Sequence, residues 1–143
     1  IDLNDYEMTL FSVDKERESG HPDEAKKFKE EIRETDGIII SFAEHNGAYA
    51  AVFKNLLDWT SRLDKSMWHG KPMLLLSTSP GGRGGATALD IAAKKFAFMD
   101  GDIKGVFSLP KFNDNFNDEE GITDPKLKSV FELELNKFIS ALD

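Results

Sequence analysis

This sequence of 143 residues contains no cysteine and no long hydrophobic run. Without cysteine the chain forms no disulfide, no thiolate metal site and no cysteine nucleophile, and its composition fits a reducing compartment. The uninterrupted apolar runs are only a few residues long, whereas a transmembrane helix needs about 20 apolar residues. We therefore expect a soluble, cytoplasmic protein with no membrane partner.

Basic residues are scarce relative to acidic ones. The chain has 18 lysines and arginines against 26 aspartates and glutamates, for a formal net charge of -8. Such a protein repels phosphate backbones unless a basic stripe compensates, and here the lysines are interleaved with acidic residues. We expect no nucleic-acid partner. The length fits a single domain over residues 1–143 with room for a buried core.

Signatures of side-chain catalysis are also missing. The histidines His21, His45 and His69 are too scattered for a metal-binding pattern such as H-E-x-x-H, so we expect no metal site. Ser79 lacks the G-x-S-x-G elbow of many hydrolases, and no G-x-x-x-x-G-K-[ST] loop indicates an NTPase. We therefore expect no catalytic side chain, which suits an enzyme whose cofactor carries the reaction.

The apolar patterns that are present predict alternating strands and helices. Continuous apolar runs predict strands over residues 38–42, 72–76 and 105–109, with another strand ending near Leu3, and we interpret 38–42 as a central strand. Helical spacing predicts helices over residues 22–34, from after Gly47 to about Leu63, 86–99 and 124–142. The segments before Gly20 and over 111–121 are expected to be loops. This alternation predicts an α/β fold with a parallel sheet and helices on both faces.

A glycine-rich turn, Ser-Pro-Gly-Gly-Arg-Gly-Gly over residues 79–85, follows one predicted strand and precedes a helix. Glycines allow several backbone N–H groups to converge on one oxygen-rich ligand, and the helix N-terminus adds partial positive charge. Arg83 can hold a phosphate or carboxylate through its planar guanidinium. The turn predicts a cofactor or phosphate site; a plain turn with a solvated arginine is the alternative.

A second unusual turn, Glu44-His45-Asn46-Gly47, follows the neighbouring strand. Ligands of open parallel sheets bind beyond the carboxyl ends of the strands, so the two turns are expected to share one site. In this interpretation Asn46 and backbone N–H groups bond the polar edge of a planar ring. The alternative is an Asn-Gly turn in which Glu44 caps the following helix.

Four residues of that following helix, Lys54, Asp58, Trp59 and Arg62, share one face at three- and four-residue spacing. Ion pairing within the helix is the simplest explanation, and a subunit contact is the alternative.

Motifs along nearly the whole chain resemble the NADPH-dependent FMN reductase family. They are Asp36-Gly37-Ile38-Ile39-Ile40, Glu44-His45-Asn46-Gly47, Lys54-Asn55-Leu56-Leu57-Asp58-Trp59, Gly70-Lys71-Pro72, Ser79-Pro80-Gly81-Gly82-Arg83-Gly84-Gly85 and the tail over 118–124. The resemblance implies a flavodoxin-like three-layer sandwich that binds FMN and uses NADPH. Hydride would pass from the nicotinamide through FMN to a small-molecule acceptor, such as a flavin, quinone, azo dye or metal oxyanion.

The resemblance also implies a set of cofactor-binding residues and a homodimer or homotetramer, with the helix over 54–62 as the candidate interface. One loop would line the isoalloxazine ring, and the other would lie opposite it, near its pyrimidine edge. The residues of the first are Ala43, Glu44, His45, Asn46 and Gly47; those of the second are Ser79, Pro80, Gly81, Gly82 and Arg83.

The sequence departs from the family pattern in three places. The family commonly has tyrosine and serine where this chain has His45 and Ala48. Its first strand and serine-rich loop, which hold the FMN phosphate, would precede Ile1. We therefore expect a domain truncated at its N-terminus. The alternative function is a cofactor-free fragment, or a flavodoxin-like interaction or electron-carrier module without reductase activity.

Overall fold

The computed structural model describes residues 1–142, and these residues form a parallel sheet of three strands. Strand β1 (Ile38–Phe42) pairs with β4 (Pro72–Thr78), which pairs on its other side with β5 (Asp102–Leu109). β4 is therefore the central strand. Its residues Met73, Leu74 and Leu75 are each 1% exposed or less, as expected of a strand that is covered on both faces.

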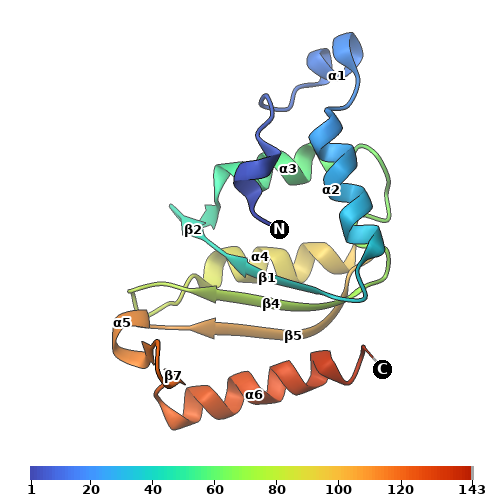
Figure 1. Ribbon diagram of the computed structural model, residues 1–143. Coiled ribbons are helices and arrows are strands. Elements are labelled where there is room, and N and C mark those ends of the chain that lie inside the picture. The colour runs from blue at the N-terminus through green and yellow to red at the C-terminus, as the bar shows by residue number, and fades with distance from the viewer. Residues whose placement is uncertain (143) are drawn as a thin grey trace.

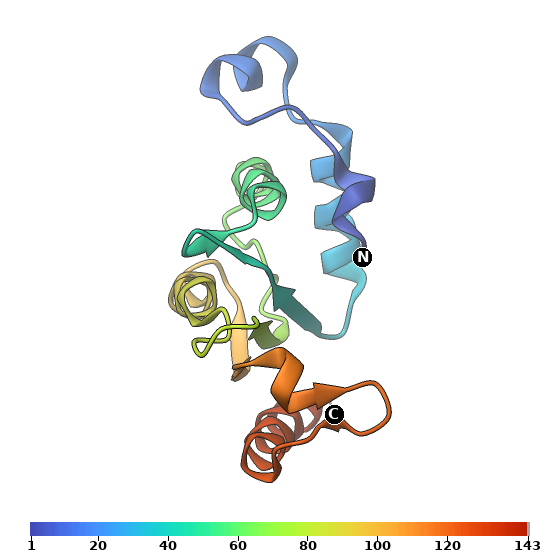
Figure 2. The ribbon, with the colours of Figure 1, turned by 90° about the vertical axis from the view of Figure 1, so that its left-hand side faces the viewer.

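Helices cover both faces of this sheet, which confirms the predicted three-layer α/β architecture. In Figure 1, α2 (Asp23–Glu34), α3 (Ala51–Thr60) and α4 (Ala86–Ala97) lie on one side, and α6 (Pro125–Ile139) lies on the other. In the end-on view of Figure 2, α2 and α3 lie above the strands and α6 lies below them. Helices α3 and α4 are the crossovers that successive parallel strands require.

Aromatic rings form much of the core on the side of α3 and α4. The ring of Phe42 on β1 lies 5.4 Å from that of Phe53 on α3, and 5.9 Å from that of Phe96 on α4. Phe96 in turn packs 4.6 Å from Trp68, and both side chains are fully buried. These contacts join the strand and helices next to both unusual turns into one packed unit.

The N-terminal segment differs from its prediction. Residues near Leu3 form a 3₁₀ helix, η1 (Leu3–Tyr6), where the end of a strand was expected. A short helix, α1 (Val13–Ser19), replaces part of the expected loop; the hydroxyl of Ser12 caps it by accepting from the backbone N–H of Lys15. No residue of α1 is buried, so the helix lacks the apolar stripe by which sequence analysis detects helices.

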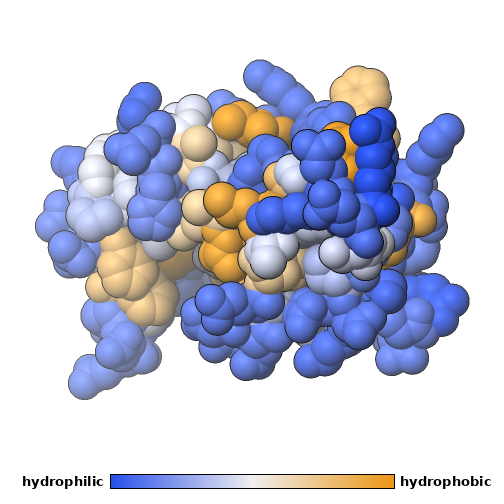
Figure 3. All heavy atoms as spheres, turned by 90° about the horizontal axis from the view of Figure 1, so that it is seen from above, coloured by the Kyte–Doolittle hydropathy of each residue, from blue (hydrophilic) through white to orange (hydrophobic). Residues whose placement is uncertain are grey.

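Strand β1 lies at the edge of the sheet, so its predicted central position is wrong for residues 1–142. Its only strand partner there is β4, and the Ile39 side chain is 54% exposed. A cavity of about 380 Å³ runs along β1 and is lined mainly by apolar residues, including Ile1, Leu3 and Ile32. Seen from the side of α1 and α3, apolar residues gather in the middle of a largely hydrophilic surface (Figure 3).

The remaining differences lie mostly at loops and element ends. Residues 111–121, expected to be a loop, contain the short helix α5 (Phe112–Asn115) and a hairpin of β6 (Phe116–Asn117) and β7 (Gly121–Ile122). β5 starts at Asp102 rather than Gly105, and α3 ends at Thr60 rather than Leu63. Helix α6 ends at Ile139 rather than Leu142.

Two apolar residues of the helices, Val52 and Val130, lie on the solvent side. In α3 the buried residues are Phe53, Leu56, Leu57, Trp59 and Thr60, whereas Val52 is 46% exposed. The helix begins only at Ala51, and its packing against β1 and α2 selects the stripe that starts at Phe53. In the outer helix α6, Val130 is 49% exposed, since only one side of the helix packs on the sheet.

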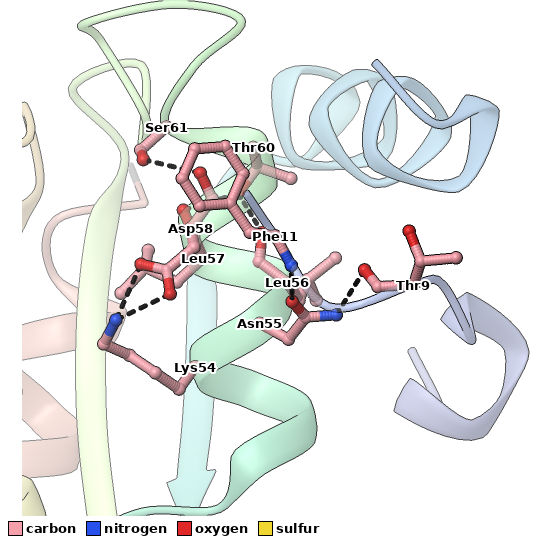
Figure 4. Close-up of polar contacts among 9 residues, drawn as sticks. All are labelled: Thr9, Phe11, Lys54, Asn55, Leu56, Leu57, Asp58, Thr60 and Ser61. Atoms are coloured by element: carbon pink, nitrogen blue, oxygen red, sulfur yellow. Dashed lines mark hydrogen bonds and ion pairs between the residues drawn. The ribbon is translucent and has the colours of Figure 1, made fainter. Parts of the chain in front are cut away.

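Asn55 on α3 holds the extended segment before α1 (Figure 4). Its side-chain oxygen accepts from the backbone N–H of Phe11 at 2.9 Å, and its amide donates to the carbonyl oxygens of Met8 and Thr9 at 3.3 and 3.2 Å. The indole N–H of Trp59 donates to the same Thr9 carbonyl at 2.7 Å. Asn55 and Trp59 thus have structural roles.

The expected ion pairing on this helix is confirmed for one pair only. Lys54 contacts Asp58 at 2.7 Å on the exposed face of α3. Arg62 instead donates to the carboxylate of Glu16 on α1 at 3.0 Å, and Trp59 is buried.

We predict that Asn55→Ala lowers the free energy of unfolding by about 1–3 kcal/mol, because it removes three hydrogen bonds and leaves backbone groups unpaired. Lys54→Ala is the control; losing an exposed ion pair one turn apart should cost about 0.5 kcal/mol or less. Urea unfolding of both variants measures the difference. Equal effects of the two substitutions would contradict the role assigned to Asn55.

Candidate functional site

The two unusual turns lie at the same end of the sheet. Strands β1, β4 and β5 are parallel, so their carboxyl ends point the same way, toward the left in Figure 1. The turn over residues 44–47 follows β1, and the glycine-rich turn over residues 79–85 follows β4. Because β1 and β4 are paired neighbours, the two turns emerge side by side, as predicted.

The first turn is a β-hairpin. Strands β2 (Glu44–His45) and β3 (Ala48–Tyr49) pair in antiparallel fashion, and Asn46 and Gly47 connect them with φ angles of 54° and 72°. Two successive positive φ angles define the tight turn that favours an Asn-Gly pair. The Asn-Gly turn expected as the alternative interpretation is therefore present, and it displays Asn46 at its exposed tip.

Glu44 caps a helix, but not the one that follows it. Its Oε2 accepts from the backbone N–H of Ala88, in the first turn of α4, at 3.0 Å. Helix α3, which sequence analysis named as the partner, begins at Ala51 without a side-chain cap. The hairpin is also held through Tyr49, whose ring stacks 5.7 Å from Phe42 and packs edge-on to Phe53.

The glycine-rich turn is anchored through its carbonyl oxygens. The backbone N–H groups of Phe112 and Lys111 donate to the carbonyls of Ser79 and Gly81 at 3.0 and 2.9 Å. The hydroxyls of Ser77 and Ser108 donate to the carbonyl of Gly84 at 2.8 and 3.0 Å. The carbonyl oxygens of Ser79, Gly81 and Gly84 are therefore used by the scaffold below the turn.

The backbone donors of this turn are left available. Among residues 1–142, no acceptor receives a hydrogen bond from the backbone N–H of Gly81, Gly82 or Arg83. All three residues are exposed. Carbonyls held inward and unpaired N–H groups at the surface make this turn a local concentration of hydrogen-bond donors, suited to a ligand that carries oxygen or nitrogen acceptors.

The fold requires glycine at one position of the turn, Gly84, but not at another, Gly82. Gly84 has a φ of +57°, and a Cβ at this position would lie 2.4 Å from the Ser108 hydroxyl oxygen and 2.8 Å from the Leu109 carbonyl oxygen. The close approach to β5 thus requires glycine there. A Cβ at Gly82 would meet nothing within 4 Å, so the fold itself does not require this glycine.

The ten predicted site residues therefore lie on two neighbouring loops. His45, Asn46 and Arg83 are exposed, and within residues 1–142 their side chains make no hydrogen bond or ion pair. Ala43 lines the cavity beside β1, but the other nine line neither that cavity nor a second one of about 470 Å³ between the sheet and α6. The cavities thus do not coincide with the space outside the loops.

Some residues that build the site were not predicted. The hydroxyls of Ser77 and Ser108 fix the glycine-rich turn from beneath, and that of Thr78 donates to the Leu109 carbonyl at 2.8 Å. Their sequence signal is the presence of hydroxyl residues at the last positions of two neighbouring apolar strands. By contrast, the motif Gly70-Lys71-Pro72 leads into the amino end of β4, away from the site.

Among residues 1–142, no group of three or more histidine, aspartate or glutamate side chains is arranged to hold a metal ion. The helices of this described part of the chain are too short or too polar to cross a membrane.

Comparison with known proteins gives consistent results. A sequence profile described as NADPH-dependent FMN reductase matches residues 1–114. The chain is 37% identical over 94 residues to a 2-hydroxy-1,4-benzoquinone reductase of Burkholderia sp, covering 65% of this chain and 50% of that protein. It is 33% identical over 94 residues to a quinone reductase of Escherichia coli (strain K12), covering 66% and 50%. The chain thus spans about half the length of these curated relatives.

A solved structure shares the fold. The flavoenzyme FerB, an NAD(P)H:(acceptor) oxidoreductase from Paracoccus denitrificans, superimposes with a TM-score of 0.71 at 21% identity, covering 98% of this chain and 76% of FerB. This similarity supports the flavodoxin-like α/β assignment.

We predict that both tyrosines of the chain ionise unusually late. Burial raises the pKa of Tyr49 to about 12, and burial together with the hydrogen bond and charge of Glu31 raises that of Tyr6 to about 12. In the folded protein, tyrosinate absorbance near 295 nm should therefore stay low through about pH 11, and in urea it should rise with a midpoint near 10.

The same shift links stability to pH. A folded pKa above the unfolded value stabilises the native state below about pH 10, and this contribution is lost as the pH rises toward 12. Tyr49→Phe should flatten this alkaline loss of stability. A folded-state tyrosinate midpoint near 10 would contradict the burial of these hydroxyls.

Proposed function

We propose, since the chain belongs to the NADPH-dependent FMN reductase family, that it forms the core of an FMN-dependent NAD(P)H oxidoreductase acting on a small acceptor of the quinone or flavin type. The observation that carries the proposal is the row of unpaired backbone donors at Gly81, Gly82 and Arg83, beside the hairpin after β1. The names of the relatives, which are quinone reductases, support the class of acceptor.

The residues present fit a flavin ring. The pyrimidine edge of the isoalloxazine carries oxygen and nitrogen acceptors, and the available donors on the glycine-rich turn match them. Neither Gly81 nor Gly82 has a side chain that would keep a flat ring away from the backbone. Asn46, unpaired at the hairpin tip, adds donors and an acceptor of its own.

The protein's contribution to the reaction is then binding, orientation and electrostatics. FMN, when bound, supplies the hydride-accepting and hydride-donating chemistry. The backbone donors of residues 81–83 are fixed in place by the carbonyl anchors beneath them, so they favour negative charge at the ring edge without rearrangement. No side chain of the two loops is required as an acid or base.

We also propose a cytoplasmic homo-oligomer. The absence of cysteine supports the compartment. The exposed residues Val52 and Lys54 and the half-buried Asp58 of α3 are the candidate subunit contact, whereas Trp59 is buried within the chain. A cofactor-free interaction module remains the alternative function, and it predicts that the protein, purified and titrated with FMN, shows no perturbed flavin absorbance bands.

Gly82→Leu tests the position of the flavin. The space around Gly82 is open, so the substitution should change the free energy of unfolding by only about 0.5 kcal/mol. The added side chain would occupy the ligand's place, and FMN affinity, measured by flavin fluorescence, should fall about tenfold or more. Ser129→Leu, on the exposed surface of α6, adds the same side chain elsewhere and should leave FMN affinity unchanged. An unaltered affinity in Gly82→Leu would remove the glycine-rich turn from the site.

Arg83→Ala tests the choice of nicotinamide. Arg83 is exposed and makes no ion pair within residues 1–142, so its guanidinium is available to the extra phosphate of NADPH. We expect kcat/KM for NADPH to fall about tenfold, with little change for NADH. Initial rates with both nucleotides measure this, and an unchanged ratio would dismiss the arginine as the source of preference.

A further inference from the structure

Helix α4 has no cap of its own. The residue before it, Gly85, has a φ of 73° and no side chain, yet the N–H of Ala88 in the first turn is buried. The N–H at this third helical position is one that an N-cap side chain commonly binds. Here the acceptor is the carboxylate of Glu44, which comes from 44 residues earlier in the chain.

This bond crosses between the two loops of the site. Glu44 is the first residue of the hairpin after β1, and the first turn of α4 is the direct continuation of the glycine-rich turn. The hairpin strands β2 and β3 have two residues each, too short to be stable as an isolated ribbon. Its orientation therefore depends on its contacts with the rest of the protein.

Two such contacts exist at the base of the hairpin. Tyr49, which is opposite Glu44 in the β2–β3 register, packs its ring on Phe42 and Phe53. This apolar contact anchors the hairpin to β1 and α3. Glu44 supplies the polar contact, and it anchors the hairpin to α4. Strand β3 also lies close to α4, so Glu44 adds a hydrogen bond that fixes an existing contact between the hairpin and this helix.

The charge of Glu44 suits this position. A carboxylate at the N-terminus of a helix is stabilised by the partial positive charge of the exposed N–H groups. Because Glu44 already lies at the N-terminus of α4, a ligand phosphate would meet a negative charge there. The anion site expected at this helix end stays a prediction, and the carboxylate of Glu44 already occupies one of the helix's N-terminal donors.

We propose that Glu44 is a positioning residue that sets the spacing between the hairpin and the glycine-rich turn, rather than a direct ligand of the flavin. The proposal rests on the proposed function for its effect on FMN, but the bond between Glu44 and Ala88 can be tested without a ligand. The carboxylate acts through the backbone of α4, by accepting the hydrogen bond of the Ala88 N–H.

The experiment compares Glu44→Ala, Glu44→Gln and the control Asp90→Ala in the protein. Glutamine retains an oxygen acceptor without the charge, alanine removes both, and Asp90 is an exposed carboxylate on α4 that makes no hydrogen bond with the rest of residues 1–142. Hydrogen exchange of the Ala88 and hairpin amides reports on the contact, and fluorescence titration gives the FMN dissociation constant.

We expect Glu44→Ala to accelerate exchange at Ala88 about tenfold or more and to weaken FMN binding by a similar factor, because the buried N–H loses its acceptor. Glu44→Gln and Asp90→Ala should stay within about threefold of the unaltered protein in both measurements. If the charge of Glu44 acted directly on FMN, Glu44→Gln would also weaken FMN binding. Unchanged FMN binding by the glutamine variant would therefore exclude that role.

Other results overturn the proposal. Unchanged Ala88 exchange in Glu44→Ala would show that the contact does not hold the helix end. Equal losses of FMN affinity in the alanine and glutamine variants, with Ala88 still protected in the glutamine variant, would assign the effect to charge. If the unaltered protein binds no FMN, the proposed function fails, and accelerated exchange in Glu44→Ala alone would still support the contact between the loops.

Discussion

The parallel pairing of β4 with its two neighbours determines where this protein can bind a ligand. Because β1 and β5 run in the same direction as β4, all three strands end on one side of the sheet, and their loops meet there. The same pairing requires helical crossovers, which supply α3 and α4 directly behind the two loops. The hairpin and the glycine-rich turn thus lie close together because the backbone hydrogen bonds between β1 and β4 hold the preceding strands side by side.

The two edge strands of the sheet, β1 and β5, are covered to different extents in residues 1–142. β5 is covered on one face by α6 and on the other by α4, whereas β1 presents an unpaired edge and a half-exposed isoleucine at position 39. Unpaired strand edges expose backbone donors and acceptors and favour association with other strands. The apolar cavity runs along this unpaired edge. It lies beside the hairpin rather than beneath the glycine-rich turn.

Local patterns in the sequence predicted the three strands of the parallel sheet, the long helices and the position of both loops, because each leaves a periodic or glycine-rich signature. They missed α1, which buries no residue and so has no apolar stripe. They also placed β1 at the centre, since an apolar run records the burial that a strand favours and not which neighbours it has. The contact between Glu44 and Ala88 had no signature, because it joins distant segments through a single side chain.

The glycine-rich turn shows why side-chain patterns alone predicted so little chemistry. Several of its carbonyl oxygens are fixed by Ser77, Ser108 and the backbone after β5, and what remains at the surface is a set of N–H groups that every residue except proline possesses. A site of this kind gives orientation and a favourable electrostatic environment, and it needs a cofactor to supply the reactive atoms. The requirement for glycine is then divided: Gly84 is needed so that the turn can approach β5, whereas Gly82 is needed only if a ligand lies against it. The fold therefore accounts for glycine at position 84 but not at position 82.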